Sequence, residues 1–408
     1  MISIIDKQDF TTEPIYIKAE YNFPIFACFQ DKKMKKIQMV DLLGQYEKIK
    51  PEIDKAIMDV VHSTAFINGP EVKLFQAELE KYLGIKHVIP CANGTDALQI
   101  AFMALGLKPG DEVITANFTF AATVEVIGLL QLKPVLVDVL SDNFTLDPKA
   151  VEAAITPKTK AIVPVHLFGQ CADMDEINKI AKKHSLYVVE DNAQAIGADF
   201  YSADGKTQKA GTMSIIGCTS FFPSKNLGCY GDGGAIFTND DAMAAKLRMI
   251  VNHGMTVQYY HDEIGVNSRL DSIQAAVLRI KLRQLDKYAE ARRKVADKYD
   301  AAFKGNPNLT IPARTSKSNH VFHQYTLVVE GADRNELRTY LASKEIPAMI
   351  YYPVPLHLQK AYADPRYKEG SFPVTENLCA KVLSLPIHTE MTDDIQDYII
   401  ENVLSFFK

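Results

Sequence analysis

One lysine of this chain lies among residues that favour covalent chemistry. Lys225 follows an aromatic pair and a proline in the run TSFFPSK, and a glycine-rich stretch, 228–234, comes after it. A lone lysine is usually a solvated surface charge, but apolar and small neighbours can remove it partly from water. Desolvation lowers the pKa of a lysine and leaves a nucleophilic amine, the condition for Schiff-base chemistry. Glycines let the backbone approach a bulky ligand.

Two other segments carry groups that such chemistry could use. The hydrophobic run that begins at Tyr187 ends in an acidic pair, Glu190-Asp191, which by itself could be an ordinary loop carboxylate. The segment 91–98, CANGTDAL, joins a predicted strand to a predicted helix. Small residues at a helix N-terminus expose N–H groups that bind phosphate, although a simple N-cap would explain the same residues.

The three segments together predict a pyridoxal-phosphate (PLP) enzyme. Such an enzyme needs a phosphate site, a carboxylate against the pyridine nitrogen and a Schiff-base lysine. The chain supplies Gly94-Thr95, Asp191 and Lys225, in that order.

Five ordered motifs resemble one known family, the sugar aminotransferases of the DegT/DnrJ/EryC1/StrS group. They are NGTDAL at 93–98, TFAAT at 119–123, EDNAQA at 190–195, SFFPSK at 220–225 and NSRLDSIQAA at 267–276. The resemblance covers about 37–408. It implies a fold-type I PLP aminotransferase, an α/β protein whose large domain has a mostly parallel mixed sheet.

The resemblance implies a role for several side chains around the cofactor. Lys225 would form the Schiff base and carry the proton between cofactor and sugar. Asp191 would pair with the pyridinium nitrogen and keep the ring protonated. Phe120 would stack on the ring, and Gln194 would contact its phenolic oxygen. Asn192 stands where the family often has a small residue, and we expect it to point away from the site.

The phosphate is expected to involve two subunits. By the same resemblance, Gly94, Thr95 and Ser220 hold it from one chain, and Asn267 reaches it from the partner. The expected assembly is therefore a homodimer with shared active sites.

The substrate is predicted from the C-terminal part of the chain. The stretches HVFHQYT at 320–326 and IYYPVPLH at 350–357 look most like enzymes that aminate C3 of UDP-linked 3-keto N-acetylglucosaminuronic acid, with glutamate as amino donor. Tyr351 and Tyr352 are expected substrate contacts, where related enzymes carry His-Tyr-Pro. Arg269 of the partner is expected to hold the sugar carboxylate, since arginine suits planar carboxylates. A dimer-interface ion pair would also explain Arg269.

Three other functions stay open at this point. One is a C3 or C4 aminotransferase for a dTDP- or UDP-linked keto-6-deoxy sugar. The second is a sugar dehydratase of the same fold, which Lys225 disfavours because that variant carries histidine there. The third is a PLP-binding regulator without turnover.

The expected elements fit the predicted fold. From about 86 to 240, short β-rich runs alternate with helical stretches, which predicts a mostly parallel sheet. Residues 271–304 read as one long amphipathic helix. We predict an N-terminal extension at 1–36, a PLP-binding large domain at 37–290, which includes the N-terminal helices, and a small α+β domain at 291–408.

Composition narrows the class of protein further. The formal net charge of −5 offers no basic surplus for nucleic acid. No secretory signal and no apolar run of ~20 residues is evident, so we expect a cytoplasmic enzyme without membrane contact. The six cysteines and the histidines lack zinc-site spacing, so no metal is expected. The resemblance further implies a part in polysaccharide biosynthesis, such as that of O-antigen.

Overall fold

The computed structural model describes residues 36–408, which form one compact unit. The predicted extension at 1–36 falls, up to Lys35, outside the described residues.

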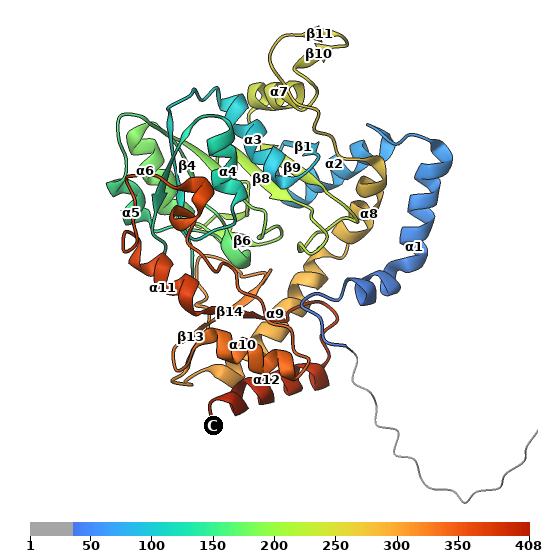
Figure 1. The fold of residues 1–408 in the computed structure, drawn as a ribbon. Coiled ribbons are helices and arrows are strands. Elements are labelled where there is room, and N and C mark those ends of the chain that lie inside the picture. Colours follow the sequence, from blue (N-terminus) through green and yellow to red (C-terminus); the bar gives the residue numbers. More distant parts are fainter. Residues whose placement is uncertain (1–35) are drawn as a thin grey trace, which may run out of the picture. The chain divides into compact units, whose positions relative to one another are not determined.

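Two helices open the described chain (Figure 1). Helix α1 (Leu42–Ser63) begins where the Asp41 side chain accepts a hydrogen bond from the Gly44 amide, and helix α2 (Pro70–Leu83) has proline at its first position. Gly84 ends α2 in the left-handed conformation, which glycine adopts without a steric penalty. Both helices pack against α8 (Ser272–Leu282).

A seven-stranded sheet forms the centre of the larger part of the molecule. Its order is β1-β9-β8-β5-β4-β2-β3, and only β9 runs antiparallel to its neighbours. The prediction of a mostly parallel mixed sheet is therefore confirmed. The strands are β1 (His87–Cys91), β2 (Glu112–Ala116), β3 (Lys133–Val137), β4 (Thr159–Val163), β5 (Tyr187–Asp191), β8 (Ile216–Ser220) and β9 (Gly234–Thr238).

Helices cover both faces of this sheet, and each face has its own apolar core. On one face lie α3 (Gly94–Leu105), α4 (Ala122–Leu129) and α7 (Asp241–Ile250), and on the other lie α5 (Pro148–Ala153) and α6 (Met174–His184). Short hairpins extend the body: β6 (Asp199–Tyr201) pairs with β7 (Thr207–Lys209), and β10 (Met255–Val257) pairs with β11 (Tyr260–His261) beyond α7.

A smaller C-terminal part has its own three-stranded sheet, β12-β13-β14, which Figure 1 shows below the large sheet. Its apolar core also receives Ile37 and the second half of α9. The bounds are β12 (Leu309–Thr310), β13 (Tyr325–Val329), β14 (Val382–Leu385), α10 (Arg334–Ser343), α11 (Pro373–Lys381) and α12 (Asp393–Phe406).

The single long helix predicted at 271–304 is wrong. The structure has two helices, α8 and α9 (Leu285–Phe303), separated at Arg283-Gln284. Leu278 and Leu282 of α8 pack in the core next to α2, whereas Tyr299 and Phe303 of α9 pack in the small-domain core. The chain changes direction between two cores, while the apolar periodicity continues across the break and conceals it.

Among residues 36–408, no helix is both long and apolar enough to cross a bilayer.

Candidate active site

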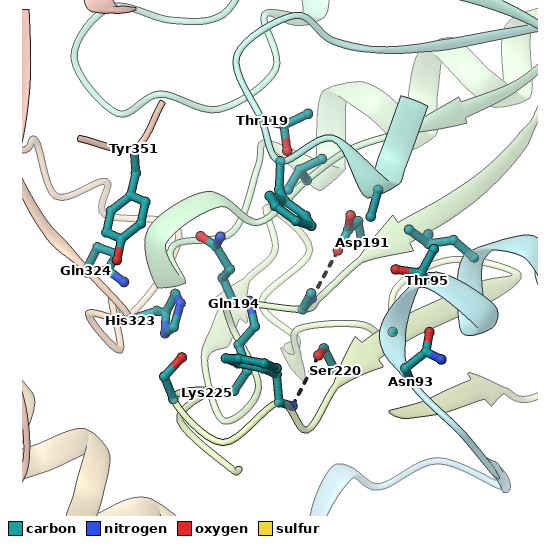
Figure 2. Close-up of a pocket in the computed structure, with 18 of the residues that line it drawn as sticks. Asn93, Thr95, Thr119, Asp191, Gln194, Ser220, Lys225, His323, Gln324 and Tyr351 are labelled. Carbon is teal, nitrogen blue, oxygen red and sulfur yellow. Dashed lines mark hydrogen bonds between the residues drawn. The ribbon is translucent and has the colours of Figure 1, made fainter. Parts of the chain in front are cut away.

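A cavity of about 460 Å³ lies where the parallel strands end and the small domain approaches them. Figure 2 shows its wall, built by the N-terminus of α3, the segments after β2, β5 and β8, and two segments of the C-terminal part. This is the edge of a parallel sheet where ligands generally bind. Nine residues predicted from the sequence line it: Gly94, Thr95, Phe120, Asp191, Gln194, Ser220, Lys225, Tyr351 and Tyr352.

The N-terminus of α3 forms one end of the cavity. The Asn93 side chain accepts from the Asp96 amide at 2.8 Å, and the Asn93 carbonyl accepts from the Ala97 amide. The first amides of the helix, those of Gly94 and Thr95, are left for a ligand. A side chain at position 94 would lie 2.7 Å from the Ser220 Cβ, so only glycine lets β8 approach this closely. Amides and hydroxyls at a helix N-terminus fit a phosphate.

Asp191, at the end of β5, is 6% exposed and firmly held. One carboxylate oxygen accepts from the Thr123 hydroxyl at 2.8 Å, and the other accepts from the Ala193 amide at 3.1 Å. The group is thus a fixed negative charge in the cavity wall, suited to a cationic ring nitrogen. Thr123 belongs to the sequence motif TFAAT, but the sequence alone indicates no role for this threonine.

Glu190, the neighbour of Asp191, proves to be structural. It is fully buried and accepts hydrogen bonds from the amides of Gly211 and Met213 and from the His166 ring at 2.9 Å. Because the Ala172 amide donates to His166 Nδ1, the ring proton lies on Nε2 and points to Glu190. No sequence pattern indicates this network, which fixes the end of β5 where Asp191 lies.

Lys225 lies in the cavity wall after β8. Burial lowers its pKa to about 8, and the negative charge of Asp191 opposes this shift. Near neutral pH such an amine has a much larger unprotonated fraction than an ordinary lysine. The next residue, Asn226, donates to the Val321 carbonyl at 3.0 Å and ties this loop to the small domain.

Gln194 and Tyr352 form a pair across the cavity. The Gln194 side-chain oxygen accepts from the Phe168 amide at 2.7 Å, and its NH₂ group donates to the Tyr352 hydroxyl at 3.2 Å. Burial raises the pKa of Tyr352, so its hydroxyl stays protonated and keeps its own proton to donate. Phe120 is 56% exposed, and its ring centroid lies 6.1 Å from that of Tyr352.

Asn267 and Arg269 do not line the cavity of their own chain. Ser268, between them, is buried and accepts from the Ala92 amide at 3.0 Å, next to the α3 N-terminus. Within residues 36–408, neither the Asn267 side chain nor the Arg269 guanidinium has a hydrogen-bond or ion-pair partner. Asn192 donates to the Ala210 carbonyl and points away from the cavity, as expected.

The sequence also missed His323 and Gln324, which line the cavity from the small domain. Both lie in the segment 320–326, whose similarity bears on the substrate, but no residue type or spacing there indicates a site.

Comparison with known proteins identifies the family. The model of the DegT/DnrJ/EryC1/StrS aminotransferase family matches residues 47–404. The chain is 47% identical to a pleiotropic regulatory protein of Geobacillus stearothermophilus, over 91% of this chain and 99% of that one. It is 46% identical to the UDP-2-acetamido-2-deoxy-3-oxo-D-glucuronate aminotransferase of Pseudomonas aeruginosa, over 86% and 95%.

Solved structures agree with this result. The DesV protein of S. venezuelae in complex with a ketimine intermediate is 40% identical, with a TM-score of 0.87 over 91% of this chain and 98% of that one. The NtdA protein of Bacillus subtilis, solved with bound PMP, the aminated form of PLP, is 31% identical, with a TM-score of 0.84 over 92% and 86%.

The cavity described above fits PLP, because it offers a phosphate site, a fixed carboxylate and a lysine of lowered pKa. The chain belongs to the DegT/DnrJ/EryC1/StrS aminotransferase family and is a PLP-dependent sugar aminotransferase.

Proposed function

We propose that this enzyme transfers the amino group of glutamate to C3 of UDP-linked 3-keto N-acetylglucosaminuronic acid. The observation that carries the transfer chemistry is one cavity that contains Lys225, Asp191 and the α3 N-terminus. The relative from Pseudomonas aeruginosa, named for a 3-oxo-glucuronate substrate, supports the choice of sugar.

Different residues of the cavity would hold different parts of the cofactor. Gly94, Thr95 and Ser220 would hold its phosphate, and Asp191 would keep the ring nitrogen protonated. Phe120 would cover one ring face, while Gln194 would lie near the phenolic oxygen. When bound, PLP supplies a carbonyl for the amino group and a ring that withdraws electrons from the neighbouring carbon.

Lys225 would act twice in each turnover. With a pKa of about 8, its Nζ is available near neutral pH both as a nucleophile and as a carrier of one proton. The half-buried Tyr352 and the apolar wall restrict water around this nitrogen, so the proton it takes up is returned to substrate rather than lost.

We further propose a homodimer in which the partner completes each site. Of the residues that line the cavity in one described chain, none is arginine, although a uronic sugar carries a carboxylate. Arg269 and Asn267 flank the anchored Ser268, and their side chains lack partners among residues 36–408. In an extended segment both would project to the side opposite Ser268, where a second subunit would receive them.

The decisive experiment is a half-reaction screen. The enzyme is loaded with amine from glutamate, and single keto-sugar nucleotides are then offered while the cofactor absorbance is followed. We expect UDP-linked 3-keto N-acetylglucosaminuronic acid to restore the spectrum fastest. Faster reaction with its neutral 6-hydroxy analogue, or with a dTDP- or UDP-linked keto-6-deoxy sugar, would contradict the proposed substrate and identify the faster compound as the preferred one.

One observation favours a second candidate, a regulator that binds PLP without turnover. The relative from Geobacillus stearothermophilus, at 47% identity, is named a pleiotropic regulatory protein. Addition of glutamate to the purified yellow protein separates the two: loss of the absorbance band shows amino-group uptake, whereas an unchanged band supports a regulator.

A further inference from the structure

His323 is a buried histidine in the cavity wall whose ring nitrogens remain unused. Its side chain lines the cavity, yet the residue is only 4% exposed. Neither ring nitrogen has a hydrogen-bond partner in the part of the chain that the structure describes, and Nδ1 is fully buried. A buried polar group without a partner costs roughly 1–3 kcal/mol. Such a cost in a ligand cavity points to a group that binding satisfies.

Contacts from several elements hold the backbone around His323 in place. The buried Arg292 donates to the carbonyls of Phe322 and Ile387, at 3.1 and 2.9 Å. On the opposite side, Gly169 approaches so closely that a Cβ there would lie 2.9 Å from the His323 amide nitrogen. Asn226, adjacent to Lys225, fixes the carbonyl of Val321. The fold therefore sets the backbone position from which the His323 ring enters the cavity wall.

The protonation state of the His323 ring limits which ligand groups the ring can bind. Burial, and then the positive charges of Lys225 and Arg292, hold the pKa of His323 well below its usual range. The imidazole is therefore neutral at physiological pH, with one nitrogen that donates and one that accepts. A neutral ring forms no ion pair with a carboxylate, and its one donor and one acceptor together suit a hydroxyl or an amide. Figure 2 shows it beside Gln324 and Tyr351, away from Asp191 and Thr95.

We propose that His323 is a specificity-determining residue that hydrogen-bonds an uncharged group of the amino-accepting sugar, a hydroxyl or its acetamido group. The inference rests on the proposed function, because it requires a sugar substrate in this cavity. Glutamate is the less suitable ligand, since apart from its amino group it offers only carboxylates, which can use the donor of the ring but not its acceptor. His323 would thus distinguish the two half-reactions that share Lys225.

The test compares two variants in both half-reactions. His323→Phe keeps a ring of similar shape without nitrogens, and His323→Gln keeps a neutral donor and acceptor. We expect His323→Phe to lower kcat/KM for the best keto-sugar nucleotide by ~10-fold, the worth of one hydrogen bond of about 1.4 kcal/mol. The glutamate half-reaction should change less than about twofold, and His323→Gln should recover most of the loss.

A binding measurement supplies a readout other than activity. In a Lys225→Ala background, calorimetry with the aminated sugar nucleotide should show a similar ~10-fold weakening by His323→Phe. Equal losses in both half-reactions, or no loss in sugar binding, would overturn the role of His323. If His323→Phe does not fold, equal losses with His323→Gln would do the same. A wild-type enzyme that accepts no keto-sugar nucleotide would instead refute the proposed function.

Discussion

The two ends of the active-site cavity differ in how completely one chain builds them. At the cofactor end, Asp191 has two hydrogen-bond donors, and the α3 N-terminus and Ser220 are packed within contact distance. At the substrate end, the ring nitrogens of His323 have no hydrogen-bond partner among residues 36–408, and on our proposal Arg269 is added there only by a second subunit. Within one described chain, the carboxylate and the helix N-terminus of the cofactor end are held in place before any ligand arrives, whereas the substrate end contains polar groups without partners.

This difference suggests how one scaffold serves related reactions. Groups at the cofactor end are fixed by strand ends and a helix N-terminus, which are rigid elements. Groups at the substrate end come from loops of the small domain and, on our proposal, from a second subunit. Changes at the cofactor end should therefore abolish the chemistry, and changes at the substrate end should redirect it.

The largest effect is expected at the cofactor end. Lys225→Ala should reduce turnover by at least ~10³-fold, because the covalent link and the proton carrier are lost together. The variant should still retain PLP through its phosphate site and Asp191, as measured by equilibrium dialysis. Lys206→Ala, which changes an exposed lysine paired with Asp204, is the matched control. Substantial transaminase activity in Lys225→Ala would remove this lysine from its role.

A smaller, selective effect is expected at the substrate end. Arg269→Ala should raise KM for the uronic sugar nucleotide by ~10²-fold, because a desolvated carboxylate loses its partner. The neutral 6-hydroxy analogue should be much less affected. Arg269→Lys keeps the charge but not the two-pronged donor, so an intermediate KM is expected. Equal loss on both sugars would favour an interface ion pair instead.

The lowered pKa of Lys225 predicts a pH dependence of about tenfold. Because burial lowers this pKa to about 8, the amine is mostly protonated at pH 7 and mostly free above pH 8. The rate at which apo-enzyme takes up PLP covalently should therefore rise ~10-fold from pH 7 to its plateau. In Asp191→Asn the midpoint should move to lower pH, since the Asp191 charge raises the Lys225 pKa. A midpoint near 10.5 would contradict a desolvated Lys225.

Mixing two defective variants tests whether each active site is shared between two subunits. In a hybrid dimer of Lys225→Ala and Asn267→Ala subunits, one site has both residues intact and the other has neither. After random subunit exchange, about a quarter of the wild-type activity should return, since half of the dimers are hybrids with one intact site. Subunit exchange is verified by mass spectrometry of the native protein. No recovery after verified exchange, or an active monomer, would exclude a shared site.

The smallest effect is expected from the N-terminal segment outside the described residues. Removal of residues up to Lys33 should leave activity within about threefold, because terminal segments of mixed polar composition are often dispensable. Activity and dimer content are measured before and after truncation. Loss of folding or assembly would show that the segment has a structural role.

The residues of the cofactor end could be predicted from the sequence alone. A phosphate site at a helix start, a carboxylate at a strand end and a lysine in an apolar loop are local patterns, because each depends on neighbours only a few residues away. Residues such as Gly94, Asp191 and Lys225 could therefore be assigned, and the strand–helix alternation predicted the sheet that brings them together. The local pattern failed at 283–284, where periodicity continues although two separate cores redirect the helix axis.

The unpartnered histidine of the substrate end could be found only in the three-dimensional structure. His323 and Lys225 lie almost a hundred residues apart in sequence. Asn226 joins their two segments, and Arg292 and Gly169 hold the segment of His323. Whether a buried histidine finds a partner depends on every atom within hydrogen-bond distance, and no sequence pattern records that distance. The His323 ring could therefore be singled out only from the three-dimensional structure. There, packing places the ring in the cavity wall and leaves its nitrogens without hydrogen-bond partners among residues 36–408.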